Sequence, residues 1–504
     1  MPLIRTNEIT ADSSFSPHDN LQIYCGLDTA VTFEVLSEFR RIHNQEPAIY
    51  AFERAIQAPY LEIMQRGFLV DQFAKHKAIT GLKSRQEILL HRLNLMAEAI
   101  WSKPLNPNSP TQLKDFFYSK MRIPEVWISS KGIKRISTNR EALEKVEQYL
   151  HARPIVAAIL ALRDIGKQLS VFETEIDFDG RFRTSYNIAG TESGRPSSSQ
   201  SAFGTGGNAQ NIAPSLRFIF QADPGHKLCV IDLEQVEARD VGFFCGALFD
   251  DWSFLDSCES GDLHTNNAKL IWPERPWTGN LKQDRLVAEQ NFYRDFSFRD
   301  MAKRGSHLSN YMGTAWTAGR SLKVPVKIME EFQARYCKGA PGIAPAFPCI
   351  PRWWNWVASE LQTTHQLVTP FGRRRHFFGR PNDDSTLREA IAFGPQSTTA
   401  DRMNLGLWRV WHKMPQVKLL AQTFDSITFQ YHESLSERDL VLQALELLLV
   451  ELECRGRKYV VPGEAKIGWN WGNYHPESNV LGLKKFSKDS PDSRVRPPMT
   501  VMGK

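Results

Sequence analysis

The sequence predicts an α+β fold, in which long helical regions surround a small antiparallel sheet. Apolar residues recur at helical spacing through most of residues 46–178 and again through 262–345. An apolar run of strand length follows each region, KLCVIDL at 227–233 and LLAQTFDSITFQY at 419–431. A chain of 504 residues has room for several subdomains around a large buried core.

The composition is ordinary for a soluble globular protein, with 42% hydrophobic and 23% charged residues. A formal charge of +6 permits an anionic partner but does not require one. None of the seven cysteines forms a CxxC pair, so we expect no zinc site and a reducing, cytoplasmic location. Residues 1–14 lack the apolar core of a signal peptide, and no run of eighteen apolar residues occurs. We therefore expect no membrane span.

The first third of the chain is predicted to be mainly helical. RGFLVD at 66–71 interrupts it as a turn and a short extended piece. Ser109 is suited to cap a helix that has Pro110 in its first position. The helical patterns cover residues 21–40, 46–100 on both sides of that turn, 138–150 and 152–176.

The segment from 179 to 213 is rich in Gly, Ser, Thr and Asn, with arginines interspersed. One interpretation is a flexible linker. The other is a binding segment, because arginines and side-chain amides distributed in this way would be odd in a pure spacer. The strand predicted at 227–233 has Asp232 at its end, and a helix is predicted from 234 to 249.

Two aspartates lie where the predicted strands end. Asp232 closes the first strand, and Asp425 with Ser426 forms the two-residue turn of a predicted hairpin. Either aspartate alone is explained as a helix cap or a turn former. Together, on adjacent strands of one sheet, they could hold two divalent cations for an in-line phosphoryl transfer, and Mg²⁺ prefers such oxygen ligands.

Four side chains recur at a step of four within FSFRDMAKRGSHLSNYMG at 296–313. A helix would place all four near one face. The first two are cations suited to a polyphosphate, and the last two carry rings suited to a flat partner. The alternative is a solvated basic helix face. The four residues are Arg299, Lys303, His307 and Tyr311.

Taken in order, these segments resemble the family A DNA polymerases, the group of bacterial DNA polymerase I, and most closely their phage branch. VIDLEQVEARDVG, RDMAKRGSHLSNYMG and AQTFDSITF look like the three polymerase motifs of that family. TSYNIAGTESGRPSSS followed by NAQNIAP is similar to the stretch that contacts primer–template DNA. Other segments that match in order are NPNSPTQL, GDLHTNNAKLIW, FGRRRHFF, PQSTTADRMNLG and EAKIGWNWG. The resemblance covers about residues 45 to 475.

The resemblance implies a right-hand polymerase fold with a helical thumb, helical fingers and an antiparallel-sheet palm. The implied reaction is template-directed attack of a primer 3′-hydroxyl on the α-phosphate of a dNTP. It uses two Mg²⁺ ions, for which Mn²⁺ can substitute. The parts are expected at 46–178 (thumb), 179–245 and 381–504 (palm) and 246–380 (fingers), after an N-terminal segment at 1–45.

The resemblance also implies a role for individual residues. The metal ligands would be Asp232, Asp425 and the backbone carbonyl of Leu233. Lys303 would also protonate the departing pyrophosphate. Glu237, held by Tyr311, would exclude a ribose 2′-hydroxyl. The nucleotide would be bound by Gln235, Glu237, His264, Arg299, Lys303, His307 and Tyr311. The DNA would be contacted by Arg181, Arg195, Asn208, Gln210 and Asn211, and the minor groove of the new base pair by Arg388 and Gln396.

Four residues depart from the family pattern, one of which is Ala392, where an amide is common. Ser426 stands where the third motif has a second acid, and Phe424 where it has a histidine. His307 stands where a phenylalanine or tyrosine usually stacks on the incoming base, which is compatible with phage relatives. We therefore expect sugar and base selection to be unusual.

At the N-terminus, Tyr24 and Asp28 resemble the last motif (YxxxD) of a 3′–5′ exonuclease domain. We expect this chain to lack proofreading. A separate exonuclease chain or a processivity factor would dock on residues 1–45. The context would be phage DNA replication in the host-cell cytoplasm. Two alternatives remain open, a single-chain RNA polymerase-like enzyme, against which Glu237 argues, and a catalytically inactive DNA-binding protein.

Overall fold

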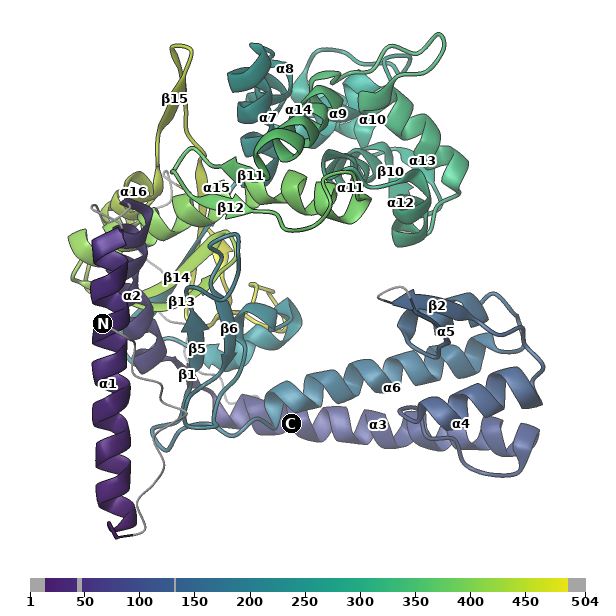
Figure 1. Ribbon diagram of the computed structural model, residues 1–504. Helices are drawn as coiled ribbons and strands as arrows, with labels where there is room; N and C mark the ends of the chain where they lie inside the picture. Colours follow the sequence, from purple (N-terminus) through teal and green to yellow (C-terminus); the bar gives the residue numbers. More distant parts are fainter. Residues whose placement is uncertain (1–13, 43–47, 131–132, 488–504) are drawn as a thin grey trace.

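A five-stranded antiparallel sheet lies at the centre of the computed structural model, which describes residues 14–42, 48–130 and 133–487 (Figure 1). Its strand order is β13-β14-β8-β17-β18. Leu228, Cys229 and Ile231 of β8 are buried, as expected for a central strand. The strands are β8 (His226–Leu233), β13 (Val417–Thr423), β14 (Ser426–His432), β17 (Gly463–Gly468) and β18 (Lys484–Lys485).

Helices from distant parts of the chain pack on this sheet. α15 (Asp384–Lys413) packs against both α7 (Val236–Phe249) and α16 (Glu437–Leu448). α2 (Ala48–Arg66) packs on β13, and α16 packs on β17. The helices therefore fix the positions of the strand ends.

A helical arm projects from the sheet (Figure 1). Its two long helices, α3 (Gln72–Trp101) and α6 (Arg153–Phe172), pack along each other. The tip has a hydrophobic core of its own, which includes Leu113, Phe116 and Phe117. The tip elements are α4 (Pro110–Lys114), the π-helix η2 (Asp115–Lys120), β2 (Trp127–Ser130), β3 (Ile133–Ile136) and α5 (Arg140–Val146).

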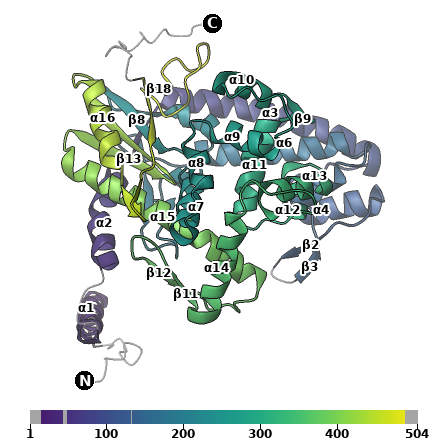
Figure 2. The ribbon, with the colours of Figure 1, turned by 90° about the horizontal axis from the view of Figure 1, so that it is seen from above.

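A second helical lobe lies across from the arm (Figures 1 and 2). It shares one continuous core with the sheet, in which Phe332 and Trp353 of the lobe belong to the same cluster as Ile231 of β8. Its elements are α8 (Ser253–Glu259), α9 (Leu263–Ile271), α10 (Leu281–Ala288), β9 (Asn291–Tyr293), β10 (Phe296–Ser297), α11 (Phe298–Asn310), α12 (Ala315–Leu322), α13 (Val326–Gln333), the π-helix η5 (Ala334–Lys338) and α14 (Cys349–Thr364).

Short strands and turns join these parts. They are β1 (Phe68–Val70), β4 (Arg181–Phe182) and β7 (Phe220–Gln221) in one sheet, the pairs β5 (Thr184–Asn187) with β6 (Ser197–Gln200), β11 (Gln366–Val368) with β12 (Arg374–His376) and β15 (Leu452–Cys454) with β16 (Arg457–Tyr459), and the 3₁₀ turns η3 (Ala209–Asn211) and η4 (Pro214–Ile219).

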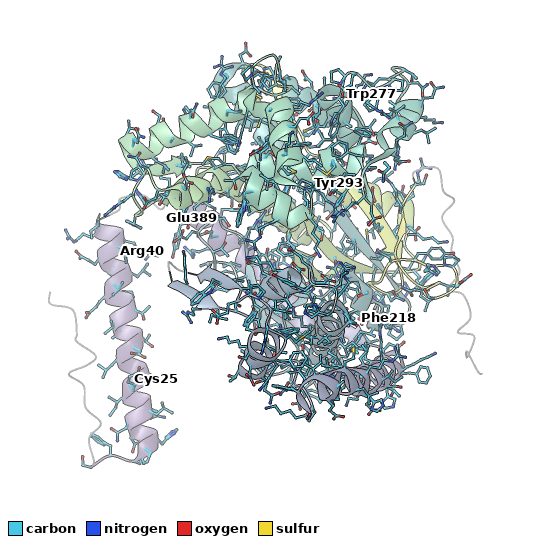
Figure 3. All side chains as sticks on the ribbon, turned by 90° about the vertical axis from the view of Figure 1, so that its right-hand side faces the viewer. Cys25, Arg40, Phe218, Trp277, Tyr293 and Glu389 are labelled. Carbon is cyan, nitrogen blue, oxygen red and sulfur yellow. The ribbon has the colours of Figure 1, made fainter. Side chains whose placement is uncertain are left out.

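The N-terminal helix α1 (Pro17–Ile42) stands clear of the body, and Figure 3 shows Cys25 and Arg40 on it. None of the residues of α1 is buried, and large apolar side chains such as Leu21 and Tyr24 are exposed. The predicted helix at 21–40 is thus confirmed. The predicted exonuclease-like segment 1–45 extends beyond it, and residues 1–13 and 43–45 lie outside the described residues.

Most predicted elements are present. Ser109 accepts a hydrogen bond from the Gln112 backbone N–H, and Pro110 begins α4, as expected. Residues 179–213 form β4, β5, β6 and η3, so the flexible-linker interpretation is wrong. The predicted hairpin forms, but its turn is Phe424-Asp425; Ser426 already pairs with Thr423 across the two strands. None of the helices within the described residues is long and apolar enough to cross a membrane.

Candidate active site

The two aspartates singled out in the sequence lie at the ends of adjacent strands. In the register of β14 with β8, Ser426 is opposite Asp232, and Asp425 is the residue before Ser426. The backbone N–H of Leu233 donates to the carbonyl oxygen of Asp425 at 2.9 Å. The hydrogen-bonded pairing of β8 and β14 thus brings together two carboxylates that are 193 residues apart (425 minus 232).

The environment of this pair suits a divalent cation. The surrounding protein removes water from Asp232 and, together with the nearby Asp425 carboxylate, raises the pKa of Asp232 to about 7. Burial also raises the pKa of Asp425, with a smaller contribution from Glu237. Two carboxylates that disfavour each other's charge provide an oxygen donor set that Mg²⁺ would stabilise. Within residues 14–42, 48–130 and 133–487, no group of three or more His, Cys, Asp or Glu side chains is arranged to hold a metal.

Two side chains hydrogen-bond to the backbone of the turn that carries Asp425. Phe424 adopts a φ of 54°, a left-handed conformation that is costly for a bulky residue. Ser426 donates its hydroxyl to the Thr423 carbonyl at 3.0 Å, and Gln422 donates its amide to the Phe424 carbonyl at 2.6 Å. Ser426 therefore closes the turn, which accounts physically for a serine at a position where the family pattern has an acid.

A cavity of about 510 Å³ opens beside Asp425 between α7, α9 and α11. Its wall contains polar groups from six separate parts of the chain. The residues predicted to bind nucleotide or DNA that line it are Arg195, Gln235, Glu237, His264, Lys303, His307, Tyr311 and Gln396.

Glu237 is held on two sides in this cavity. The Tyr311 hydroxyl donates to Glu237 Oε2 at 2.5 Å, and Arg195 Nη2 donates to Oε1. Tyr311 lies just after α11, as its C-cap residue, and not within the helix. Arg195 was predicted to contact DNA, but its guanidinium is paired with Glu237 in the cavity wall.

Three polar atoms of residues in the cavity wall lack a partner. His264 Nδ1, Gln235 Oε1 and Arg195 Nε are buried without a hydrogen bond from the described residues. Burial, and next the positive charges of Arg299 and Lys303, lower the pKa of His264 to about 4, so its ring is neutral at pH 7. Gln235 has a φ of 55° at the start of α7. Orphaned polar atoms and backbone strain together indicate a site built for a polar ligand.

Arg299 is the exception on α11. It does not line this cavity but a neighbouring hollow of about 360 Å³, with Glu289, Asp295 and Asp300. Its Nε and Nη2 donate to the two carboxylate oxygens of Asp262 at 3.2 and 3.0 Å. Asp262 went unnoticed in the sequence, although its place directly before the helical segment LHTNN is a helix-capping signal.

The remaining residues predicted to contact DNA do not line this cavity. Gln210 is buried, and its amide lies 3.3 Å from the Gln422 side chain and 3.2 Å from the Pro196 carbonyl. Asn208 caps η3 and bonds to Ser198. Both amides hydrogen-bond within the protein in this structure, and their contact with DNA stays a prediction. Only Asn211 of this trio is exposed.

Arg181 and Arg388 also lie outside the cavity. Arg181 pairs with Asp223 at 2.6 Å, at the opposite end of β8 from Asp232. A turn joins Asp223 to β8, and the six steps of strand from His226 to Asp232 span about 20 Å, so Arg181 is not beside the carboxylate pair. Arg388 pairs with Asp384 at 2.9 Å on the first turns of α15.

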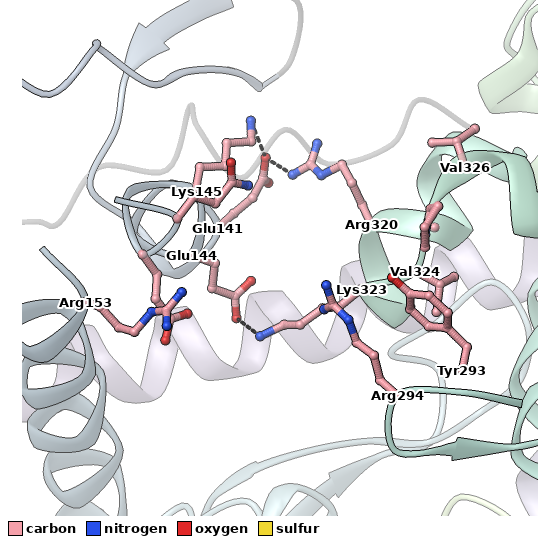
Figure 4. Close-up of a pocket in the computed structure, with 14 residues that line it drawn as sticks. Glu141, Glu144, Lys145, Arg153, Tyr293, Arg294, Arg320, Lys323, Val324 and Val326 are labelled. Atoms are coloured by element: carbon pink, nitrogen blue, oxygen red, sulfur yellow. Dashed lines mark ion pairs between the residues drawn. The ribbon is translucent and has the colours of Figure 1, made fainter. Parts of the chain in front are cut away.

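A larger cavity than the one beside Asp425 is lined by neither of the two aspartates. It has a volume of about 830 Å³ and lies where the arm tip meets the helical lobe (Figure 4). Two ion pairs span it, Glu141 of α5 with Arg320 of α12, and Glu144 with Lys323 at 3.7 Å. Its charged, solvent-open wall offers no group for chemistry, so size does not identify the active site here.

Residues 77–473 match the family model described as DNA polymerase family A. The chain is 24% identical over 425 residues to "DNA polymerase I, thermostable" of Thermus thermophilus, which covers 81% of this chain and 46% of that protein. It is 23% identical over 494 residues to "DNA polymerase I" of Chloroflexus aurantiacus, covering 91% of this chain and 47% of that protein. The chain thus spans less than half the length of these curated relatives.

A solved structure has the same fold. It is the POL domain of Pol1 from M. smegmatis in complex with DNA primer-template and dNTP, with a TM-score of 0.66 and 20% sequence identity. The match covers 83% of this chain and 69% of that chain.

Proposed function

Because this chain belongs to DNA polymerase family A, we propose that it is a template-directed DNA polymerase that adds dNTPs to a primer 3′-hydroxyl. One observation carries the proposal: Asp232 and Asp425 meet at adjacent strand ends, beside a cavity whose far wall presents Lys303 and His307 of α11. Carboxylates on one side and a lysine on the other suit the transfer of a nucleotidyl group from a triphosphate.

The parts of the structure fit the right-hand arrangement. We assign the arm at 46–178 as the thumb, the central sheet at 179–245 and 381–504 as the palm, and the helical lobe at 246–380 as the fingers. The cavity then lies between palm and fingers, where an incoming nucleotide would meet the primer end.

The residues at the palm would act on the reacting groups. Asp232, Asp425 and the Leu233 carbonyl would hold two Mg²⁺ ions, which stabilise the attacking and leaving oxygens of an in-line displacement. Lys303 would neutralise charge near the α-phosphate and protonate the departing pyrophosphate. His264, neutral at pH 7, would donate or accept a hydrogen bond at the phosphates through its unpaired Nδ1.

The residues around Glu237 would select the sugar and the base. Glu237, fixed by Tyr311 and Arg195, would occupy the space that a ribose 2′-hydroxyl needs. The His307 ring, edge-on to Tyr311 with centroids 5.4 Å apart, would stack on the incoming base. Gln396 in the cavity wall would meet the minor-groove edge of the new pair, which is similar for all four pairs.

Primer extension tests the proposal. The purified chain is given a primer–template with dNTPs or rNTPs, in Mg²⁺ or Mn²⁺, beside Asp425→Ala. We expect extension with dNTPs that Asp425→Ala abolishes. Preferential use of rNTPs would support an RNA polymerase-like enzyme, and DNA binding without any extension would support an inactive DNA-binding protein.

Three finer points belong to the same proposal. We propose phage replication as the setting, on the resemblance of His307 to phage relatives. We propose that this chain does not proofread, because Asp28 lies on α1, none of whose residues is buried. A separate exonuclease or processivity factor would bind the exposed apolar residues of α1. Degradation of a 3′-labelled primer that Asp28→Ala abolishes would contradict the second point.

A further inference from the structure

Asp262 connects two helices of the proposed nucleotide site. Its carboxylate oxygens accept both Nε and Nη2 of Arg299, in a forked ion pair between the start of α9 and the first turn of α11. The pair is shielded from solvent, with side-chain exposures of 10% for Asp262 and 25% for Arg299. A forked guanidinium–carboxylate contact fixes orientation as well as charge.

The carboxylate is itself immobilised. Asp262 is the N-cap residue of α9, and it accepts the Thr265 backbone N–H at 3.2 Å and the Thr265 hydroxyl at 2.9 Å. These hydrogen bonds and the Arg299 charge lower the pKa of Asp262 in spite of its burial, so the group stays ionised. Arg299 is therefore tied to a rigid helix start and not to a mobile side chain.

The fork leaves part of Arg299 available. A guanidinium has five N–H donors, and Asp262 uses one on Nε and one on Nη2, so the Nη1 side can bind a second anion. Arg299 precedes Lys303 by one helical turn, a rise of about 6 Å. That spacing suits a chain of phosphates whose α-phosphate lies at Lys303.

The surroundings of Arg299 explain why a tether is needed. The hollow that Arg299 lines also contains Glu289, Asp295 and Asp300. Without Asp262, Arg299 would have these other carboxylates as partners, and its guanidinium would turn toward them. The guanidinium would then no longer be held one helical turn before Lys303, at the edge of the phosphate path that the two cations would define.

We propose that Asp262 is a positioning residue, which holds Arg299 one turn beyond Lys303 so that its free edge binds the γ-phosphate of the incoming dNTP. The inference rests on the proposed polymerase function and names the part of the substrate that this pair recognises. The competing role for Asp262 is inhibitory. If Asp262 competed with phosphate for Arg299, removal of the carboxylate would tighten nucleotide binding.

The test compares dNTP with dNDP, which lacks the γ-phosphate. The variant is Asp262→Asn, because asparagine caps a helix as well as aspartate does but carries no charge. In steady-state primer extension we expect the KM for dNTP to rise about tenfold, as for a weakened charge-assisted contact, with kcat changed less than threefold. The Ki of dNDP as a competitive inhibitor should stay within twofold.

Two further variants complete the experiment. Asp284→Asn makes the same chemical change at a buried aspartate of the same lobe that pairs with Lys269, and it should leave the KM for dNTP and the Ki of dNDP unchanged. In an Arg299→Ala background, Asp262→Asn should have no further effect on the KM for dNTP.

Three results would overturn the inference: a lower KM for dNTP in Asp262→Asn, a parallel rise of the KM for dNTP and the Ki of dNDP, or additive effects with Arg299→Ala. Failure of the polymerase proposal is seen separately, because the wild-type chain would then not extend a primer. Calorimetric titration with dNTP and dNDP would still measure the effect of Asp262→Asn on γ-phosphate recognition.

Discussion

The buried ion pair between Asp240 and Arg402 offers the sharpest test of how the palm is held together. Asp240 lies one turn after Glu237 on α7, and Arg402 lies on α15; both side chains are fully buried. The Asp240 carboxylate accepts three hydrogen bonds: from Arg402 Nη2 at 3.2 Å, from the Tyr459 hydroxyl at 3.0 Å and from the Thr399 hydroxyl at 3.0 Å. The perturbation we consider is Asp240→Asn, which keeps the shape and removes the charge.

The expected cost follows from what the variant leaves behind. Arg402 would stay buried with its charge uncompensated, since its only other oxygen partner within the described residues is the Val450 carbonyl. Removing one partner of a buried ion pair costs about 3–5 kcal/mol. Tyr459 donates to Oδ1 of Asp240 and Thr399 to Oδ2. In the variant an amide oxygen at the first position still accepts from Tyr459, and the Thr399 hydroxyl can rotate to accept from the amide NH2, so these two contacts add little to the cost. Arg402→Met alone orphans the carboxylate, and the double variant removes both charges.

Hydrogen exchange read by mass spectrometry suits a chain of several subdomains, because a single global unfolding free energy is not defined for it. Peptides from α7 and α15 should open about 3–5 kcal/mol more readily in Asp240→Asn than in the wild type. The double variant should recover about 2 kcal/mol of that loss. A cost below about 1 kcal/mol, or a double variant as labile as Asp240→Asn, would refute the reasoning.

Three further predictions concern the proposed site and its surroundings. His264 has a folded-state pKa of about 4 against an ordinary value near 6.5, so folding favours its neutral form. As the pH falls from 6.5 to 4, protonation of His264 in the unfolded state should lower the unfolding free energy of the wild type by up to about 3 kcal/mol relative to His264→Gln, with no difference above pH 7. Equal pH profiles of the two proteins in hydrogen exchange would contradict this. Tyr311→Phe removes one hydrogen bond from Glu237 and should raise rNTP incorporation, measured as the ratio of kcat/KM for rNTP to that for dNTP, less than Glu237→Ala does. An equal rise would show that the Tyr311 hydroxyl alone holds Glu237 in place and that Arg195 does not contribute. Glu141→Lys should separate the arm tip from the helical lobe, and Arg320→Glu in the same chain should restore the contact by exchanging the two charges. If the distance between dyes on the arm tip and the lobe, measured by fluorescence energy transfer, is the same in all variants, this ion pair does not hold the two parts together.

Local sequence signals predicted much of this fold because local forces decide those elements. Ser109 with Pro110 starts a helix, and the polar step-of-four pattern from Arg299 to His307 lies on one helix. The hairpin was predicted one residue out of register, because the sequence does not say that Phe424 accepts a left-handed conformation. That conformation costs free energy, and the bonds from Gln422 and Ser426 offset it only in the folded sheet.

The residues predicted to contact DNA show what spacing along the chain leaves open. Asn208 and Gln210 carry the expected amides, yet both are engaged inside the protein. Arg195 is drawn to Glu237, and Arg181 to Asp223. Each is a choice among charged or polar partners that are distant in sequence, and spacing along the chain carries no information about it.

The sequence by itself determined which chemical groups this protein can present: two aspartates at strand ends, a basic helix face and an acid that follows a strand. The tertiary structure decided which of them meet. Pairing of β8 with β14 brings Asp232 and Asp425 together, and the packing of α9 against α11 gives Arg299 to Asp262. Side-chain chemistry is a property of each residue, whereas proximity depends on long-range backbone pairing and on a shared core. The residues at a step of four on α11 therefore face two different places: Lys303 and His307 line the cavity, whereas Arg299 is paired with Asp262 in the neighbouring hollow.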